Sequence, residues 1–161
     1  MVDEIDAQEI EKIAISSTKI RNSINEGDLK TTKTYLGRFF SLTGKVVKGD
    51  GLGKQINYPT ANISIEEDYK IIPKDGVYYI KTTIDNKLYN GMMNIGHRPT
   101  IGTKEKSIEV NLFSFDKDIY DKVISVDVVE KIREEKKFSS IEALKTQLAK
   151  DEEHCLKLIN K

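Results

Sequence analysis

The sequence is poor in the residues that build disulfides, metal clusters and stacked nucleic-acid surfaces. Its 161 residues include one cysteine, two histidines and no tryptophan. The single cysteine, Cys155, excludes an internal disulfide, and with two histidines it does not supply a zinc-ligand set. Lysine plus arginine and aspartate plus glutamate both total 26, so no global field favours nucleic acid or acidic membranes. Neutral charge and the lack of tryptophan argue against a barrel that binds single-stranded nucleic acid.

Long apolar runs are missing as well. No stretch approaches the length of a membrane span, and the acidic start with Asp3, Glu4 and Asp6 lacks the basic residues and apolar stretch of a signal peptide. We therefore expect a cytoplasmic protein with no membrane partner. The length suits one full domain with one active site, plus a short appendage.

Helical spacing of apolar residues is present in the first quarter of the chain. From Ser17 to about Phe40 the spacing predicts a helix, with the residues 16–18 placed as its N-cap. Gly27 and Asp28 are expected to break this stretch into two short helices.

A second helical pattern follows Ile132. Ser139 and Ser140 are candidate N-caps for a helix that runs toward the C-terminus. The apolar stripe of this helix is predicted to be Ile141, Leu144, Leu148 and Leu156. We expect the helix to pack on the rest of the domain and assign its stripe to packing.

Between the helical regions the apolar period changes to that of strands. The segments are short, rich in β-branched or aromatic residues, and separated by Asp-Gly, Asp-Asn or charged turns. The predicted strands or extended segments cover residues 46–47, 58–65, 77–84, 88–94, 107–115 and 123–129. Regularly spaced short strands favour a small antiparallel barrel over a βαβ sheet.

The glycine-rich segment Gly-Asp-Gly-Leu-Gly-Lys is the first candidate for binding chemistry. Gly49, Gly51 and Gly53 would let the backbone approach a ligand and point N–H groups at phosphate oxygens, and Lys54 ends the segment. It is not a Walker loop, because a Lys-Ser/Thr ending is missing and no strand-to-helix context is expected. Taken alone, three glycines are more typical of a hairpin tip.

A Pro-Thr-Ala-Asn segment follows the glycines. Thr60 and Asn62 are two residues apart, so on an extended strand their side chains share one side. A hydroxyl and an amide carbonyl are the hard oxygen donors that suit Mg²⁺. A Pro-Thr turn with Asn62 as a strand cap explains the same spacing.

Taken together, the motifs resemble the riboflavin kinase family. Its signature is a glycine-rich loop followed by an aromatic residue and Pro-Thr-Ala-Asn, here Tyr58 to Asn62. Further motifs follow in family order, covering residues 75–78, 94–100, 108–120 and 133–138. The resemblance implies a mainly β fold: a small antiparallel Greek-key barrel, with a C-terminal helix packed on it and short N-terminal helices.

The resemblance also implies the roles of the phosphate and catalytic residues. Glu109 occupies the place of the family's catalytic carboxylate, which would accept the proton of the attacking ribityl hydroxyl. Thr60 and Asn62 would ligate Mg²⁺ and the ATP phosphates, and the glycine loop with Lys54 would close over them. From the residues alone, Glu109 alternates with apolar neighbours and equally fits a solvated strand position.

A second group of residues would contact the flavin by the same likeness. Asn111 and Phe113 share the strand face of Glu109, and Phe113 is expected to border the flavin. Asn111 itself departs from the family, which often has histidine there. The expected flavin-binding residues are Asn94, Arg98, Phe113, Arg133 and Glu134.

The N-terminal segment resembles a different module. Residues 15–21, 27–28 and 36–38 are similar to the end of the FMN adenylyltransferase module that precedes the kinase in bifunctional bacterial proteins. We therefore interpret residues 1–40 as the end of that partner domain and residues 41–161 as the kinase domain. The resemblance implies an enzyme that converts riboflavin and ATP to FMN and ADP, and we expect no adenylyltransferase activity. The alternative is a flavin- or nucleotide-binding module that lacks chemistry.

Overall fold

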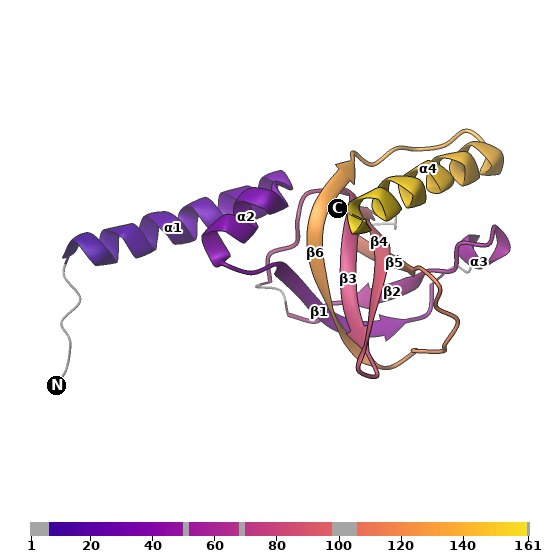
Figure 1. The fold of residues 1–161 in the computed structure, drawn as a ribbon, viewed down its shortest axis with the longest axis horizontal. Coiled ribbons are helices and arrows are strands. Elements are labelled where there is room, and N and C mark those ends of the chain that lie inside the picture. The colour runs from indigo at the N-terminus through magenta and orange to yellow at the C-terminus, as the bar shows by residue number, and fades with distance from the viewer. Residues whose placement is uncertain (1–6, 50–51, 68–69, 98–105, 161) are drawn as a thin grey trace, which may run out of the picture.

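The fold is a six-stranded barrel flanked by helices at both ends of the chain (Figure 1). The computed structural model describes residues 7–49, 52–67, 70–97 and 106–160. The strands are β1 (Phe40–Val47), β2 (Ala61–Ser64), β3 (Gly76–Ile84), β4 (Lys87–His97), β5 (Lys106–Leu112) and β6 (Val123–Arg133). The helices are α1 (Ala7–Glu26), α2 (Leu29–Leu36), α3 (Leu52–Gln55) and α4 (Ile141–Ile159).

The strand order is that of a Greek key. All neighbours pair antiparallel, and the closed order is β1-β2-β5-β4-β3-β6. Strands β3, β4 and β5 follow one another across the sheet, and β6 then returns to lie beside β3. Pairing of β1 with β2 and β6 closes the sheet. The predicted small antiparallel Greek-key barrel with flanking helices is confirmed.

The barrel interior holds the main hydrophobic core. Along β5, Ile108 and Val110 face this core while Glu109 between them does not, as expected for a side-chain period of two. The same alternation in the other strands brings Leu42, Tyr78 and Val126 into the interior, each at most 1% exposed. Apolar side chains from all six strands therefore fill the barrel, and the side chains on its outer face can contact helices or ligands.

A second apolar cluster lies between the outside of the barrel and α4. Ser140 caps α4 by accepting a hydrogen bond from the Ala143 N–H, as predicted. The predicted stripe was wrong at its two ends, because Ile141 is 56% and Leu156 44% exposed. Further along the helix, the side that faces the barrel carries Cys155, which is fully buried. The barrel-facing side of α4 therefore includes Leu148, the buried polar residue Asp151 and Cys155, at intervals of three and four residues.

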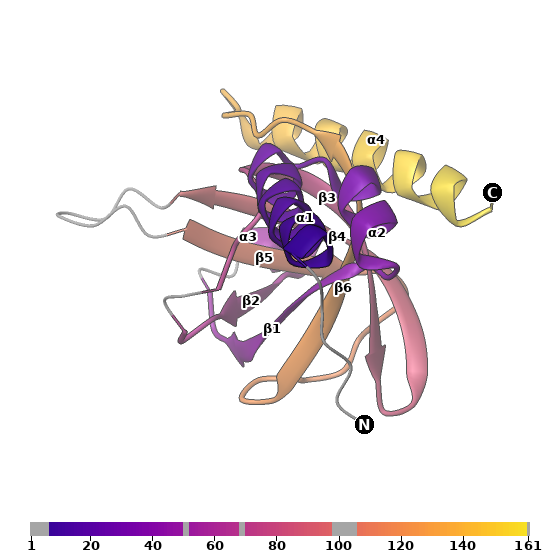
Figure 2. The same cartoon turned by 90° about the vertical axis from the view of Figure 1, so that its left-hand side faces the viewer.

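The N-terminal helices meet at the predicted break. Gly27 has a φ of 76°, which glycine adopts without strain, and Asp28 accepts a hydrogen bond from the Thr31 N–H to cap α2. The predicted N-cap at residues 16–18 was wrong, since α1 begins at Ala7. Figures 1 and 2 show α1 extending away from the barrel, with its C-terminal end beside α2.

One helix was not expected. The one-turn α3 includes Gly53 and Lys54, so the end of the glycine-rich segment is helical and is not part of a simple hairpin tip. Within the described part of the chain, no helix has both the length and the apolar character required to cross a membrane.

Candidate active site

One row of paired residues runs across five strands on the outside of the barrel. Asn62 of β2 lies opposite Glu109 of β5, which in turn lies opposite Asn94 of β4. Asn94 lies opposite Val77 of β3, and Val77 lies opposite Arg133 of β6. Each of the first four has a strand neighbour in the interior core, namely Ile63, Ile108, Ile95 and Tyr78, so these four side chains face outward. The register thus gathers residues that are distant in sequence.

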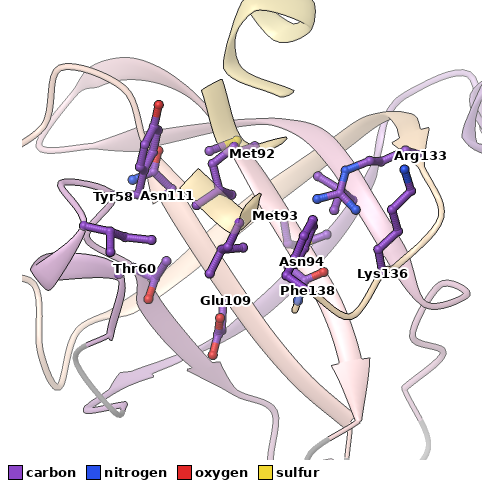
Figure 3. A pocket seen from close by; sticks show the side chains of 15 residues that line it. Tyr58, Thr60, Met92, Met93, Asn94, Glu109, Asn111, Arg133, Lys136 and Phe138 are labelled. Carbon is purple, nitrogen blue, oxygen red and sulfur yellow. The ribbon is translucent and has the colours of Figure 1, made fainter. Parts of the chain in front are cut away.

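A pocket of about 230 Å³ lies over Glu109, Asn94, Val77 and Arg133 of this row, between the barrel, α4 and the segments on either side (Figure 3). Tyr58, Thr60 and Asn111 stand at one side of the pocket in this view, and Arg133 and Lys136 at the other. The described residues that line it are Gly53, Ile56, Tyr58, Thr60, Val77, Met92, Met93, Asn94, Glu109, Asn111, Arg133, Lys136, Phe138, Leu144 and Leu148. A mainly apolar wall with a few convergent polar groups is typical of a small-molecule site.

Tyr58 links the pocket wall to α4. Burial, followed by a hydrogen bond and the negative charge of Glu152, raises the pKa of its phenol. The phenol therefore stays protonated at neutral pH and presents a flat, uncharged ring to the pocket.

Arg133 is held in the opposite wall by a buried ion pair. Its Nε and Nη2 donate to the carboxylate of Asp151 at 2.8–3.0 Å, and Asp151 is 2% exposed. Gln147 donates a further hydrogen bond to the same carboxylate. The guanidinium also lies 5.8 Å from the ring centre of Phe138. This network ties the end of β6 to α4 and fixes the orientation of Arg133.

The segment between β6 and α4 crosses close to β4. A Cβ placed on Gly96 would lie 2.0 Å from a carboxylate oxygen of Glu135, so the absence of a side chain at Gly96 leaves room for the segment. Lys136 and Phe138, which follow Glu135, line the pocket. Close approach at Gly96 therefore allows this segment to form one wall.

The glycine-rich segment packs against the Pro-Thr-Ala-Asn segment. A Cβ on Gly49 would lie 1.9 Å from Nδ2 of Asn62, and one on Gly53 would lie 2.2 Å from the Tyr58 carbonyl oxygen. The Tyr58 N–H also donates to the Gly53 carbonyl. Two of the predicted phosphate-binding glycines thus lie directly against the candidate metal-binding segment, while Gly51 lies outside the described residues.

Thr60 stands between the pocket and a wider neighbouring hollow. This hollow, about 680 Å³, is also lined by Lys54, Asp118 and Tyr120. Thr60 lines both spaces. Asn62, two residues further along in β2, is 7% exposed. A group held at Thr60 would therefore be reachable from both sides.

Two of the predicted flavin contacts, Phe113 and Glu134, do not line the pocket that Asn94 and Arg133 line. Phe113 follows the end of β5, packs in the cluster beneath α4 and lines a separate hollow with Lys145. Glu134 points to Lys131 and Lys74, and its hydrogen bond with Lys131 is the main cause of its lowered pKa. Arg98 lies outside the described residues.

Sequence reasoning passed over several pocket residues. Lys136 and Phe138 were within a recognised motif, but a charged run before a helix is typical of a solvated linker. Leu144 and Leu148 were assigned to packing, and they also line the pocket. Asn111 was noted for its strand face and for its departure from the family. For Asn111, Leu144 and Leu148 the signal was that the alternation of β5 and the stripe of α4 point to one common space.

Comparison with known proteins identifies relatives along most of the chain. Residues 36–159 match the riboflavin kinase (flavokinase) family. The chain is 38% identical over 146 residues to the bifunctional riboflavin kinase/FMN adenylyltransferase of Bacillus subtilis, covering 89% of this chain and 46% of that protein. The Escherichia coli protein of the same name is 37% identical over 141 residues, with 87% and 44% covered. The chain spans about half the length of the curated relatives it matches.

Two solved structures share the fold. A Streptococcus pneumoniae structure described as a macrolide-efflux protein has a TM-score of 0.81 at 38% identity and covers 86% of this chain and 45% of its own. The riboflavin kinase of Trypanosoma brucei has a TM-score of 0.52 at 25% identity, with 75% and 80% covered. By sequence match, relatives and fold, the chain belongs to the riboflavin kinase family.

Proposed function

We propose that this chain is an active riboflavin kinase, which transfers the γ-phosphate of ATP to the 5′-hydroxyl of the ribityl chain of riboflavin and releases FMN and ADP. The observation that carries the proposal is the position of Glu109. Its strand register places it directly between Asn62 and Asn94, and it lines the same pocket as Thr60. A carboxylate beside hard oxygen donors and an apolar pocket is the arrangement that phosphorylation of a bulky alcohol requires.

The pocket suits a flavin. Met92, Leu148 and Phe138 supply an apolar lining, and Tyr58 supplies an uncharged ring for one edge. Flat aromatic ligands gain most from such walls, because they bury a large apolar area at a small loss of conformational freedom. Asn94 and Arg133 supply hydrogen-bond donors within this wall, which suits the carbonyl oxygens and ring nitrogens of an isoalloxazine.

The neighbouring hollow suits the nucleotide. Lys54 supplies a positive charge there, and Tyr120 is 46% exposed and offers an aromatic face for a base. Because Thr60 lines both spaces, a γ-phosphate held at Thr60 would reach an alcohol in the flavin pocket. This arrangement supports an in-line transfer between two substrates that enter from different sides.

Thr60 and Asn62 fit a magnesium ion. Mg²⁺ is usually held by one or two protein oxygens together with waters and phosphate oxygens. Among the described residues, no group of three or more histidine, cysteine, aspartate or glutamate side chains forms a metal cage. We propose that the Thr60 hydroxyl and the Asn62 carbonyl oxygen hold the ion with the ATP phosphates. When bound, Mg²⁺ would neutralise charge on the phosphoryl group and the departing ADP.

Glu109 would then act as the general base. As the ribityl 5′-oxygen forms its bond to the γ-phosphorus, its proton passes to the Glu109 carboxylate. The bond between the γ-phosphorus and the β,γ-bridging oxygen breaks, and ADP leaves with that electron pair. Gly49 and Gly53 keep the loop backbone close to Thr60 and Asn62, where N–H groups favour phosphate oxygens.

The direct test is to incubate the purified chain with riboflavin, ATP and Mg²⁺ and to separate the flavins by chromatography. We expect FMN without FAD, because residues 1–40 are proposed to be only the end of an adenylyltransferase partner domain. The Glu109→Gln protein is the matched negative control. FAD as a product would overturn the account of residues 1–40. Unconverted riboflavin from a folded protein that binds flavin would instead indicate a binding module without chemistry.

A further inference from the structure

The segment that carries Thr60 joins the sheet at a weak point. Pairing of β2 with β5 comprises Asn62 opposite Glu109 and Ala61 opposite Val110. Thr60 lies one residue before this pairing. Pro59, which precedes Thr60, has no N–H with which to extend the ladder of backbone hydrogen bonds. The position of Thr60 relative to Glu109 therefore needs a contact beyond the backbone ladder.

Asn111 supplies that contact. Its Nδ2 donates a hydrogen bond of 2.8 Å to the carbonyl oxygen of Pro59. Asn111 is 8% exposed and lies on the same outward face of β5 as Glu109, two residues away. Backbone pairing with β4, where it lies opposite Met92, holds its main chain in place. The side chain thus extends the link between β5 and the Pro-Thr segment past the last paired residues.

We infer that Asn111 is a positioning residue for Thr60 and, through it, for the phosphates of Mg·ATP. By holding the Pro59 carbonyl, Asn111 holds the peptide that leads into Thr60. Strand β5 therefore positions both the proposed base, Glu109, and the proposed phosphate ligand, Thr60. The effect on Mg·ATP rests on the proposed function, whereas the hydrogen bond from Asn111 to Pro59 is a feature of the structure.

Positioning of this kind matters because phosphoryl transfer depends mostly on geometry. A misplacement of about 1 Å costs on the order of 100-fold in rate. Loss of the Asn111 hydrogen bond frees the Pro59 peptide without removing any group that touches the phosphates. The expected signature is therefore weaker productive binding of Mg·ATP, while riboflavin, held mainly by the apolar walls, binds nearly as before.

The experiment compares three variants at Asn111. Asn111→Leu removes the donor and keeps the volume, and Asn111→Asp keeps the shape but turns an acceptor toward the Pro59 carbonyl. Asn111→His restores a donor, since imidazole Nδ1 lies at the same distance along the side chain as the asparagine amide. We expect KM for Mg·ATP to rise about 10-fold to 100-fold in the first two, with KM for riboflavin little changed, and most of this loss to be recovered in Asn111→His.

A double-mutant cycle with Thr60→Val shows whether Asn111 acts through Thr60. If it does, Asn111→Leu adds little to the defect already caused by Thr60→Val, because the group being positioned is gone. Additive effects would overturn the inference, and so would a rise in KM for riboflavin that matches the rise for Mg·ATP. Either result would make Asn111 a direct contact or a general structural residue.

A matched control is available on the neighbouring strand. Asn90 of β4 is half-buried and accepts a hydrogen bond of 2.6 Å from the Tyr79 hydroxyl, away from Thr60. Asn90→Leu removes a comparable hydrogen bond, so we expect a similar small loss of stability with unchanged kinetics. If Asn90→Leu raised KM for Mg·ATP as much as Asn111→Leu, the effect would be one of general stability and the inference would fail.

Calorimetric titration with the magnesium complex of β,γ-imido-ATP, which ordinary phosphoryl transfer cannot cleave, separates this inference from the proposed function. If the wild-type chain makes no FMN, the proposed function fails. The affinity for the analogue still tests Asn111, because its γ-phosphate can bind at Thr60 without turnover. Weaker binding of the analogue in Asn111→Leu and Asn111→Asp, with recovery in Asn111→His, supports the inference. Equal affinity in all four proteins overturns it.

Discussion

The inside and the outside of the barrel differ in what they bury. The interior is filled by apolar side chains such as Ile80, Met93 and Val128, all completely inaccessible to solvent. The outer face beneath α4 buries apolar residues too, but it adds the carboxylate of Asp151, 2% exposed, and the amide of Asn111, 8% exposed. Each of these polar groups is hydrogen-bonded. The interior therefore stabilises the fold, and the outer face combines stability with chemistry.

Strand β5 contributes to both surfaces. Ile108 and Val110 point into the interior core, whereas Glu109 and Asn111 point to the pocket. A side-chain period of two makes this division sharp, because adjacent residues cannot exchange roles without a shift in register. Substitutions at neighbouring positions of β5 should thus affect stability or catalysis separately.

Glu109→Gln should give the largest functional effect. We expect kcat for FMN formation to fall by about 10²–10⁴-fold, the usual contribution of a positioned general base. The substitution keeps the size of an outward-facing side chain, so the thermal midpoint and the affinity for riboflavin should remain near those of the wild type. Steady-state kinetics and a thermal melt measure the two quantities. Near-normal turnover would remove Glu109 from the mechanism.

Asp151→Ala tests whether the outer face also carries stability. The change leaves the buried Arg133 guanidinium without its partner, which costs about 3–5 kcal/mol in comparable buried pairs. Urea unfolding followed by circular dichroism measures the free energy of unfolding. A loss below about 1 kcal/mol, the range of an exposed pair, would show that the ion pair is not desolvated in solution.

The double variant Arg133→Met, Asp151→Leu distinguishes the contribution of this ion pair to stability from its contribution to riboflavin binding. Apolar replacements for a buried ion pair are often neutral or stabilising, so we expect stability to return close to the wild-type level. Riboflavin affinity should nevertheless be weaker than in the wild type, because the pocket has lost the guanidinium of Arg133. Full recovery of affinity, measured by flavin fluorescence titration, would show that Arg133 serves packing alone.

Much of the fold was predictable because local signals agreed with one another. Alternation of apolar residues located the strands, and Ser140 marked the start of α4 as predicted. The errors arose where tertiary contacts decide. Sequence periodicity favoured Leu156, but the helix turns Cys155 toward the barrel. The start of α1 was misplaced because serine and threonine favour N-caps, yet here residues 16–18 lie within the helix.

The candidate site was harder than the fold to predict from residue patterns. From its pattern alone, Glu109 fitted a solvated strand position, and the resemblance to a family singled it out. The decisive relation is the register that aligns Asn62, Glu109 and Asn94, and no short-range pattern specifies which strands will be neighbours. The hydrogen bond from Asn111 to Pro59 joins residues 52 positions apart. Such contacts depend on the closed sheet as a whole.

Ile108→Val should give a smaller effect, on stability alone. Ile108 is 3% exposed in the interior core and adjoins Glu109 along β5. Removal of one buried methylene typically costs about 0.5–1.5 kcal/mol. We expect this loss in urea unfolding, with kcat and both KM values unchanged. A fall in kcat comparable to that of Glu109→Gln would show that the two faces of β5 are not independent.

The smallest expected effect is an alkaline dependence of stability that comes from Cys155. Burial, followed by the nearby negative charges of Asp151 and Glu152, raises the pKa of its thiol to about 12. In the unfolded chain the thiol titrates near its ordinary pKa, about 8.5. The unfolded state therefore loses this proton first, so the stabilising contribution is complete below that pH and declines as pH rises toward the folded-state pKa.

Cys155→Ala provides the comparison for this effect. The free energy of unfolding of the wild type should fall between about pH 8.5 and 10, below the range in which tyrosines titrate, and the slope should be shallower in the variant. Slopes are compared because the lost thiol also changes packing at every pH. Equal slopes would contradict full burial of Cys155 in solution. The barrel-facing side of α4 would then be open to solvent. Because Asp151 on the same side holds Arg133 in the pocket wall, the buried setting of that ion pair would be in question as well.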